Sequence, residues 1–340
     1  MRRSLFPLGA ASMLLAPTIF LLAACERSGP AFNESKAIWN QFDGEKALAH
    51  VATIVAIGPR PSGSEGLEKS RVFLEEQLAG FGWQVQRQDF EKKTSIGKVE
   101  FVNLRARFAP SDSEKLWNRG VQVLLCSHYD TKLYRDLEFV GANDPGSSMG
   151  ALLEAARVLA RRPELASQIE LVFFDGEEAF GPNITATDGL YGSTFYAGEM
   201  LQRDAVQRPR YGVLLDMVGD RDLKVDIAAK LPPLDLRELK EREIDPREIS
   251  EIRERMTRLC LDAADEAGNR KYFGVTSSYI TDDHVPLNQV AGIPTIDLID
   301  FDYDYWHTPS DTLDKLSAES LDIVGETTLL LIEKYLMPGL

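Results

Sequence analysis

Two adjacent glutamates, Glu177 and Glu178, have the residue type and the position to do acid–base or metal chemistry. Residues 169–174 read Ile-Glu-Leu-Val-Phe-Phe, which is typical of a strand buried inside a sheet. Asp175 and Gly176 end this run, and both carboxylates follow directly. Ligands of open α/β sheets bind at the carboxyl ends of the strands. One glutamate could therefore hold a metal while its neighbour moves a proton, although an ordinary polar loop would look similar.

Four further polar residues follow predicted strands, namely His128, Asp144, Asp216 and His307. If these strands are parallel neighbours, their carboxyl ends lie at one edge of the sheet, and the four side chains converge there with Glu178. Histidine and carboxylate ligands without cysteine suit a catalytic Zn²⁺, which keeps one position open for water or substrate. Each residue alone has a simpler explanation, such as a helix cap or a histidine hydrogen-bonded within the fold. The joint pattern favours a metal site.

Helices and strands that alternate along the chain must position these residues. Amphipathic spacing predicts helices at residues 44–57, 64–80, 149–159, 245–267 and 317–335. Apolar or alternating runs predict strands at residues 83–90, 101–108, 121–126, 169–174, 211–216 and 294–299. Most of these strands are apolar throughout. We therefore predict a three-layer α/β fold, with a central mixed and mostly parallel sheet and helices on both faces.

Composition limits the classes of function. The chain has 340 residues, of which 44% are hydrophobic, and this is enough for a sizeable core. A formal net charge of −15 argues against nucleic acid as a partner, and we assign most of the acidic excess to a solvated surface. Cys126 and Cys260 are far apart in the sequence, one in a predicted strand and one in a predicted helix. Two buried free thiols are expected rather than a disulfide.

The first 25 residues have the layout of a targeting segment. Arg2 and Arg3 precede an apolar run, and Leu-Ala-Ala closes it directly before Cys25. This layout resembles a bacterial lipoprotein signal, which implies removal of residues 1–24 and lipid attachment to Cys25. Residues 25–36 would form a tether and residues 37–340 a single catalytic domain. The protein would then face the periplasm or the exterior and contact the membrane only through its lipid; an uncleaved anchor and an ordinary signal peptide are the alternatives.

The motifs, in their order along the chain, resemble the M28 clan of zinc-dependent peptidases. The matching segments are His128-Tyr-Asp130, Asn143-Asp144, Glu177-Glu178, Asp216, Asp282-Asp283-His284 and Trp306-His307-Thr308. Residues 58–64, Gly-Pro-Arg-Pro-Ser-Gly-Ser, are similar to a segment common in bacterial members. The resemblance covers nearly all of residues 45–336. It implies the zinc-exopeptidase fold, which is also called phosphorylase/hydrolase-like.

Within the clan, the sequence is more similar to the glutaminyl-peptide cyclotransferases. Residues 173–180 and 188–193 resemble the central block of these cyclases. Trp306 precedes His307, where aminopeptidases more often have tyrosine. The resemblance implies cyclisation of N-terminal glutamine in peptides and proteins, and the alternative is a zinc aminopeptidase of the same clan that removes N-terminal residues.

The resemblance also implies a role for each matched position. Asp144, Glu178 and His307 would hold one zinc ion. Glu177 would be the acid/base residue, because it lies next to a ligand without being one. One residue with a raised pKa could take the proton of the substrate amine and return it to the leaving ammonia. Trp306 is the candidate for the substrate pocket wall, with burial in the core as the alternative.

A second set of residues is compatible with both activities. Asp216 and Asp282 would complete the proton and amine-binding network of a cyclase. In a two-zinc aminopeptidase, Asp144 would bridge the ions, and His128 and Asp216 would hold the second one. Asp130 resembles the carboxylate that orients His128. Cyclases keep these residues without necessarily binding a second ion, so their presence does not decide the number of ions. One zinc ion is expected, because the attacking amine of a cyclase belongs to the substrate and needs no activated water, and two ions are the alternative.

Two further expectations concern the backbone. Clan members have a cis peptide after the aspartate that corresponds to Asp144, and proline lowers the cost of this isomer from about 3 to about 1 kcal/mol. We therefore predict a cis Asp144–Pro145 bond. Residues 224–254 match no segment of the family and are rich in charge, so we expect them at the surface.

Overall fold

The structure is a computed structural model that describes residues 37–109, 116–233, 242 and 244–338. The expected signal segment, Cys25 and the whole tether lie outside the described residues. Among the residues described, no helix is both long enough and apolar enough to cross a bilayer.

One sheet of eight strands organises the described residues, in the order β1-β2-β4-β3-β5-β8-β6-β7. The strands are β1 (Trp83–Thr94), β2 (Gly97–Phe108), β3 (Val123–His128), β4 (Ile169–Phe174), β5 (Tyr211–Asp216), β6 (Val225–Lys230), β7 (Phe273–Tyr279) and β8 (Thr295–Ile299). The pairs β3–β4, β3–β5, β5–β8 and β6–β7 are parallel. The pairs β1–β2, β2–β4 and β6–β8 are antiparallel. The predicted mixed, mostly parallel sheet is confirmed.

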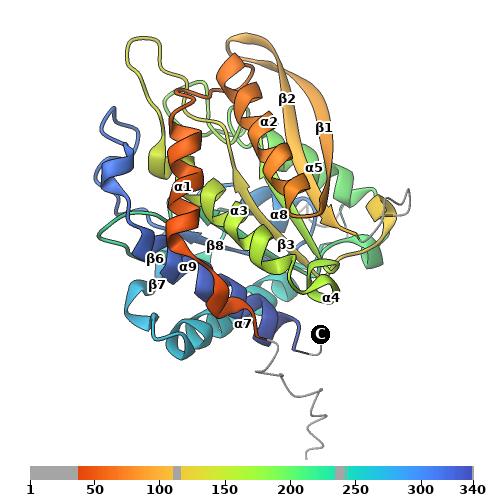
Figure 1. Cartoon of the computed structure of the whole chain (residues 1–340). Helices are drawn as coiled ribbons and strands as arrows, with labels where there is room; N and C mark the ends of the chain where they lie inside the picture. Colours follow the sequence, from red (N-terminus) through yellow and green to blue (C-terminus); the bar gives the residue numbers. More distant parts are fainter. Residues whose placement is uncertain (1–36, 110–115, 234–241, 243, 339–340) are drawn as a thin grey trace, which may run out of the picture.

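Helices cover both faces of this sheet. They are α1 (Gly44–Val55), α2 (Glu65–Gly80), α3 (Ser148–Leu159), α4 (Pro163–Ala166), α5 (Tyr191–Leu201), α7 (Pro246–Glu266), α8 (His284–Gln289) and α9 (Ala318–Leu330). Alternate residues of a strand point to opposite faces. Leu125, Leu171 and Val213 pack in the core that includes α1, α2, α3, α7 and α9. Leu124 and Val172 pack in a separate core with α5 and α8. Figure 1 shows α1, α2 and α3 together on one side of the sheet.

Local sequence signals explain where the principal helices begin. The side chain of Asp43 accepts a hydrogen bond from the backbone of Lys46 at the start of α1. Ser64 caps α2 in the same way, as predicted. Asp245 caps α7 and Pro246 occupies its first turn, where a missing N–H has no cost. The helix boundaries predicted from the sequence are therefore correct to within a few residues.

Strands β6 and β7 were not predicted from the sequence. Residues 225–230 form an inner strand of the sheet, so the charge-rich segment at residues 224–254 is not wholly at the surface, contrary to the expectation. β7 reads Phe-Gly-Val-Thr-Ser-Ser-Tyr, and glycine and serine weaken the strand signal. β7 lies at the end of the sheet, and β6 is its neighbouring strand there. Pairing with β6 therefore stabilises an extended conformation that the sequence of β7 favours only weakly.

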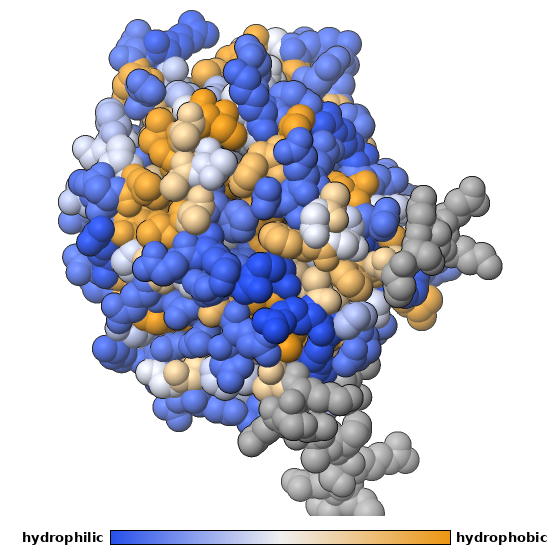
Figure 2. All heavy atoms as spheres, viewed as in Figure 1, coloured by the Kyte–Doolittle hydropathy of each residue, from blue (hydrophilic) through white to orange (hydrophobic). Residues whose placement is uncertain are grey.

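The state of the two remaining cysteines and the character of the surface both match the expectations from the sequence. Cys126 and Cys260 are free and buried, as predicted. Figure 2 shows hydrophilic residues over most of the face that carries α1, α2 and α3, with smaller apolar patches between them. This pattern fits the solvated surface expected from the acidic composition.

Candidate metal centre and active site

The predicted site residues meet at one edge of the sheet. Strands β4, β3, β5 and β8 are consecutive parallel neighbours, so their carboxyl ends lie side by side. His128 ends β3 and Asp216 ends β5. Glu178 follows β4, and His307 lies in the loop after β8. The convergence that the strand-end pattern predicts is therefore present in the fold.

Asp144 reaches this edge from a short helical segment, Ala142–Ser147, directly before α3. The Asp144–Pro145 peptide is cis, as predicted. Asp311, in the loop after His307, accepts hydrogen bonds from the backbone nitrogens of Asn143 and Asp144, at 2.7 and 3.1 Å. Asp311 thus fixes the backbone at Asn143 and Asp144, and the backbone in turn positions the Asp144 carboxylate.

Asp144, Glu178 and His307 form a compact group of metal-ligand atoms. The Nε2 atom of His307 lies 2.9 Å from Oε1 of Glu178 and 3.3 Å from Oδ2 of Asp144. The three donor atoms lie within 4.8 Å of one another. One nitrogen and two oxygen donors fit a catalytic zinc site that leaves one position for substrate. This group, which we call the zinc triad, is the one expected from the family resemblance.

A second group shares Asp144 with the zinc triad. The Nε2 atom of His128 lies 3.3 Å from Oδ1 of Asp144 and 3.3 Å from Oδ1 of Asp216. The donor atoms of these three buried residues also lie within 4.8 Å of one another. The two oxygens of Asp144 therefore face different histidines, so the arrangement has donors for one ion or for two.

The electrostatics of both groups favour a bound cation. Burial alone would lower the pKa of His307, but Asp144 and Glu178 outweigh it and raise this pKa to about 10. The pKa of His128 is also raised well above its usual value, because Asp130, Asp144 and Asp216 outweigh the effect of burial. Carboxylates that hold protons on two histidines this firmly also attract a divalent metal, which binds in place of those protons.

Glu177 lies beside the zinc triad and belongs to neither metal group. Its side chain is buried and lines the site pocket. Burial raises the pKa of Glu177 well above its usual value, and the nearby charges of Glu178, Asp282 and Asp283 add to this effect. A carboxyl group with a raised pKa is suited to accept and return a proton. The geometry therefore fits the acid/base role that the resemblance implies for Glu177.

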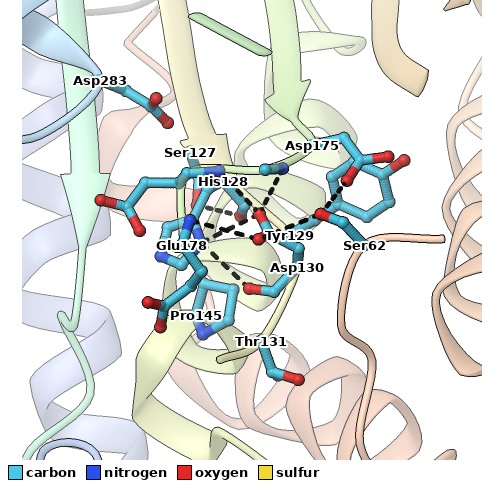
Figure 3. Close-up of polar contacts among 12 residues, drawn as sticks. Ser62, Ser127, His128, Tyr129, Asp130, Thr131, Pro145, Asp175, Glu178 and Asp283 are labelled. Carbon is cyan, nitrogen blue, oxygen red and sulfur yellow. Dashed lines mark hydrogen bonds and ion pairs between the residues drawn. The ribbon is translucent and has the colours of Figure 1, made fainter. Parts of the chain in front are cut away.

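Asp130 positions the loop that carries both glutamates (Figure 3). Its Oδ1 atom accepts hydrogen bonds from the backbone nitrogens of Gly176 and Glu177, at 2.9 and 3.1 Å. Its Oδ2 atom accepts one from the backbone nitrogen of Glu178 at 3.3 Å. The Nδ1 atom of His128 lies 3.1 Å from the backbone carbonyl oxygen of Asp130 and 3.6 Å from Oδ1. Asp130 therefore contacts His128 as expected, and it also holds three consecutive backbone groups of the glutamate loop.

The segment at residues 58–64 supports the same region from the other side. The hydroxyl of Ser62 donates to Oδ1 of Asp175 at 2.7 Å (Figure 3). Arg60 is fully buried and donates to the backbone carbonyls of Val140 and Gly141, at 2.8 and 3.1 Å. The motif thus supports both the chain that leads to Asp144 and Asp175, which lies two residues before Glu177.

The site opens into a pocket of about 230 Å³. Trp306 lines it, is 41% exposed and stacks on His307 with ring centroids 4.2 Å apart. This exposure rules out the alternative that Trp306 is a core residue. Ile280 and Phe301 add apolar walls. The backbone of His307 has a φ of 56°, a left-handed conformation that costs energy and is common at functional sites.

Asp216 and Asp282 form an acidic wall of this pocket. Burial raises the pKa of Asp216 to about 6. Burial and the charges of Asp297 and Asp216 raise the pKa of Asp282 well above its usual value. Behind Asp282, the Nδ1 atom of His284 lies 3.3 Å from Oδ2 of Asp297, and all these groups are buried. Asp282, His284 and Asp297 thus form a third cluster of buried ionisable groups, with donor atoms within 4.8 Å of one another.

Two residues of the site were not predicted. Lys132 is buried, and its Nζ atom lies 3.3 Å from Oε2 of Glu178. Asp311 accepts hydrogen bonds from the backbone nitrogens of Asn143 and Asp144. It also accepts one from the hydroxyl of Tyr303 at 2.8 Å. Both lie within four residues of a recognised motif, and that proximity was the one available signal.

Comparisons with known proteins identify one family. The model of peptidase family M28 matches residues 103–332. A glutaminyl-peptide cyclotransferase of Drosophila melanogaster is 27% identical, with 99% of this chain and 93% of that protein covered. The crystal structure of an Acidobacteriales bacterium glutaminyl cyclase is 32% identical, covers 86% of this chain and 94% of that chain, and has a TM-score of 0.67. A leucine aminopeptidase precursor from Bacteroides thetaiotaomicron is 25% identical, covers 86% of this chain and 97% of that chain, and has a TM-score of 0.69.

Proposed function

The chain belongs to peptidase family M28, and from this membership we propose that it is a zinc-dependent glutaminyl-peptide cyclotransferase. It converts the N-terminal glutamine of peptides and proteins to pyroglutamate and releases ammonia. The observation that carries the proposal is a free, buried carboxyl group, Glu177, beside the zinc triad in a small pocket.

The pocket favours one folded residue over a long ligand. Its volume of about 230 Å³ is below the range of about 300 to 1,000 Å³ that is usual for drug-sized ligands. Glutamine must bend its side chain back on its own amine to react, which is a problem of orientation. Trp306, Ile280 and Phe301 supply apolar walls that can hold the bent side chain.

Proton transfer falls to the chain's own residues. The substrate amine must lose a proton as it attacks the γ-amide carbonyl, and the leaving nitrogen must gain one. Glu177 can perform both transfers because it does not belong to the metal-ligand group. Asp282 and Asp216 lie on the same pocket wall and can accept hydrogen bonds from the amine. Zinc held by Asp144, Glu178 and His307 would polarise the γ-amide carbonyl and stabilise negative charge on its oxygen.

We propose that one zinc ion is sufficient. The attacking amine belongs to the substrate, so the reaction needs no activated water. A single zinc ion held by the zinc triad would be enough to polarise the γ-amide carbonyl. The second group, His128, Asp144 and Asp216, supports a different candidate function, a two-zinc aminopeptidase. One of the similar structures is that of a leucine aminopeptidase precursor, which also favours that alternative.

A single assay separates these activities. Purified zinc-loaded protein is mixed with a Gln-initiated peptide and, separately, with a Leu-initiated peptide of the same downstream sequence. The proposal predicts that the first peptide becomes lighter by one ammonia and that the second is unchanged. Loss of a whole residue from either peptide would instead establish an aminopeptidase, and no change in either peptide would contradict both functions.

We also propose that the reaction takes place at the cell envelope. The support is the lipoprotein-type sequence that ends at Cys25. Metabolic labelling with a radioactive fatty acid should mark the full-length protein and should fail for Cys25→Ser. Equal labelling of both proteins would contradict lipid attachment at Cys25.

A further inference from the structure

A peptide substrate must extend beyond the pocket that receives its first residue. This inference rests on the proposed function, in which N-terminal glutamine occupies the pocket and the following residues leave through its mouth. Tyr279, Ile280 and Phe301 line the pocket, and the same three residues line a second hollow of about 660 Å³. The two cavities therefore adjoin, with these three residues at their common boundary.

The floor of the second hollow is the β6–β7 strand pair. Asp226, Gly274, Thr276 and Ser278 line it. Asp226 pairs with Gly274 across the two strands, and side chains two residues apart in a strand share a face. Gly274 has no side chain, and a Cβ atom there would lie 3.1 Å from Oδ1 of Asp226. The glycine thus keeps the floor open.

The walls present the groups that an extended peptide needs. Lys224 and Asp302 form an ion pair on one side, and both are well exposed. Lys271 lies over the ring of Tyr272, 4.6 Å from its centroid. Phe301 is 51% exposed at the junction with the pocket. Apolar surface beside charges of both signs suits backbone and mixed side chains better than a small ligand of one charge.

We propose that this hollow binds the residues that follow the N-terminal glutamine. The occupant is an extended peptide or protein N-terminus, and the hollow makes the protein prefer such substrates to glutaminyl dipeptides. Binding energy from residues remote from the reacting bond can raise kcat/KM. A preference of about tenfold corresponds to about 1.4 kcal/mol of that energy.

The test compares a Gln-initiated heptapeptide with the dipeptide amide that shares its first two residues. We expect the zinc-loaded protein to have a kcat/KM about tenfold higher for the heptapeptide. Thr276→Trp and Ser278→Trp place a large side chain in the hollow and should bring the ratio of the two values close to one. Ser277→Trp is the matched control, because Ser277 is exposed and does not line the hollow, so the variant should keep the wild-type ratio.

Three results would overturn the inference: equal kcat/KM values for the two substrates in the wild-type protein, a ratio unchanged in both Trp variants that fill the hollow, or the same loss in Ser277→Trp. Calorimetry with the pyroglutamyl heptapeptide provides a readout without turnover. This product should bind the wild-type protein and Ser277→Trp more tightly than the pyroglutamyl dipeptide amide does. If neither Gln substrate reacts, the proposed function fails, and the calorimetric comparison still decides whether the hollow binds peptide.

Discussion

Asp130 shows how a residue outside the metal groups can determine their geometry. Its carboxylate accepts hydrogen bonds from three consecutive backbone nitrogens, those of Gly176, Glu177 and Glu178. Those bonds fix the direction in which the two glutamate side chains leave the backbone. Asp130, which follows β3, therefore helps to place Glu178 as a metal ligand and Glu177 as a proton carrier.

Replacing Asp130 by asparagine should weaken zinc binding. The amide group has only one acceptor oxygen, and its NH₂ group would face a backbone N–H that also donates. We expect zinc affinity to fall by about 10- to 100-fold, as is common when groups that support metal ligands are removed. Competition with a chromophoric chelator measures this. Asp136→Asn, an exposed position in the same loop, is the control and should bind zinc normally; unchanged affinity in Asp130→Asn would contradict the positioning role.

Replacing Glu177 by glutamine should separate metal binding from catalysis. The residue belongs to neither metal group, so the variant should retain its zinc. Without a group that accepts the amine proton, kcat should fall by about 10²- to 10⁴-fold. Metal analysis and the cyclisation assay, run on the same preparation, check both statements. Glu138→Gln, an exposed change, should match the wild type. Normal turnover by Glu177→Gln would remove Glu177 from its proposed role.

The sequence identified those residues of the candidate site whose type and position follow from metal chemistry, and the structure brings these residues together. Glu178 and His307 are visible because metal ligands must be particular residue types near strand ends. Lys132 and Asp311 were missed for a physical reason. Lys132 contacts a ligand through space, and Asp311 acts on backbone nitrogens, which any sequence provides. Neither interaction requires a recognisable spacing.

At the scale of elements, a buried ion cluster joins the strand that carries the glutamate loop to its antiparallel neighbour. Glu170 of β4 pairs in register with Arg107 of β2. The Nε atoms of Arg105 and Arg107 donate to Glu170 at 2.6 and 2.8 Å. This cluster explains why a glutamate interrupts an otherwise apolar strand: β2 supplies two arginines that need a buried partner.

Replacing Glu170 by glutamine should destabilise the fold by about 3–5 kcal/mol, because it leaves buried arginines without a counter-charge. Urea unfolding at neutral pH measures this. Glu75→Gln is the matched control, since Glu75 pairs with Arg87 at 2.7 Å in a far more exposed position. A partly exposed pair of this kind contributes about 0–1 kcal/mol. Equal losses in the two variants would contradict a special role for the buried cluster.

The same cluster predicts a pH dependence. Burial alone would raise the pKa of Glu170, but Arg105 and Arg107 outweigh it and lower this pKa to about 2 from 4.5. The ionised form is therefore favoured in the folded state. This contribution to stability is fully present above about pH 4.5 and is lost as the pH falls through about 2. Glu170→Gln should show a shallower loss of stability over this interval than the wild type, and parallel curves would contradict the assignment.

Element prediction succeeded for buried strands and capped helices and failed at one end of the sheet. β3 and β4 are buried at every position, so a plain apolar run identifies them. β7 has a burial pattern that is mostly exposed or intermediate, and its sequence contains glycine and two serines. Its conformation depends on pairing with β6. The paired residues are about fifty positions apart, so a short stretch of sequence around β7 does not contain this information.

At the scale of the whole molecule, the sheet brings together residues that span from His128 to His307 along the chain. The fold class was predictable because helices and strands alternate regularly and the strands are apolar. The second hollow beside the pocket was not predictable, because it depends on β6, β7 and the loop at Phe301 meeting in space.

Because the zinc triad joins distant segments, bound zinc should stabilise the whole fold. A ligand present at 100 times its Kd adds about 2.7 kcal/mol to the free energy of unfolding. We expect a chelator to lower the Tm of the zinc-loaded protein and added zinc to restore it. His307→Ala removes one ligand, so its Tm should respond much less to either treatment. A wild-type Tm that is insensitive to the chelator would contradict metal binding that bridges these segments.

The central claim is that Asp144, Glu178 and His307 hold one zinc ion beside Glu177. Anomalous diffraction from crystals of the zinc-loaded protein, recorded on both sides of the zinc absorption edge, tests it most directly. The account predicts one strong anomalous peak between the Asp144 and Glu178 carboxylates and Nε2 of His307. The absence of a peak there, or a second peak of similar height between His128 and Asp216, would contradict it.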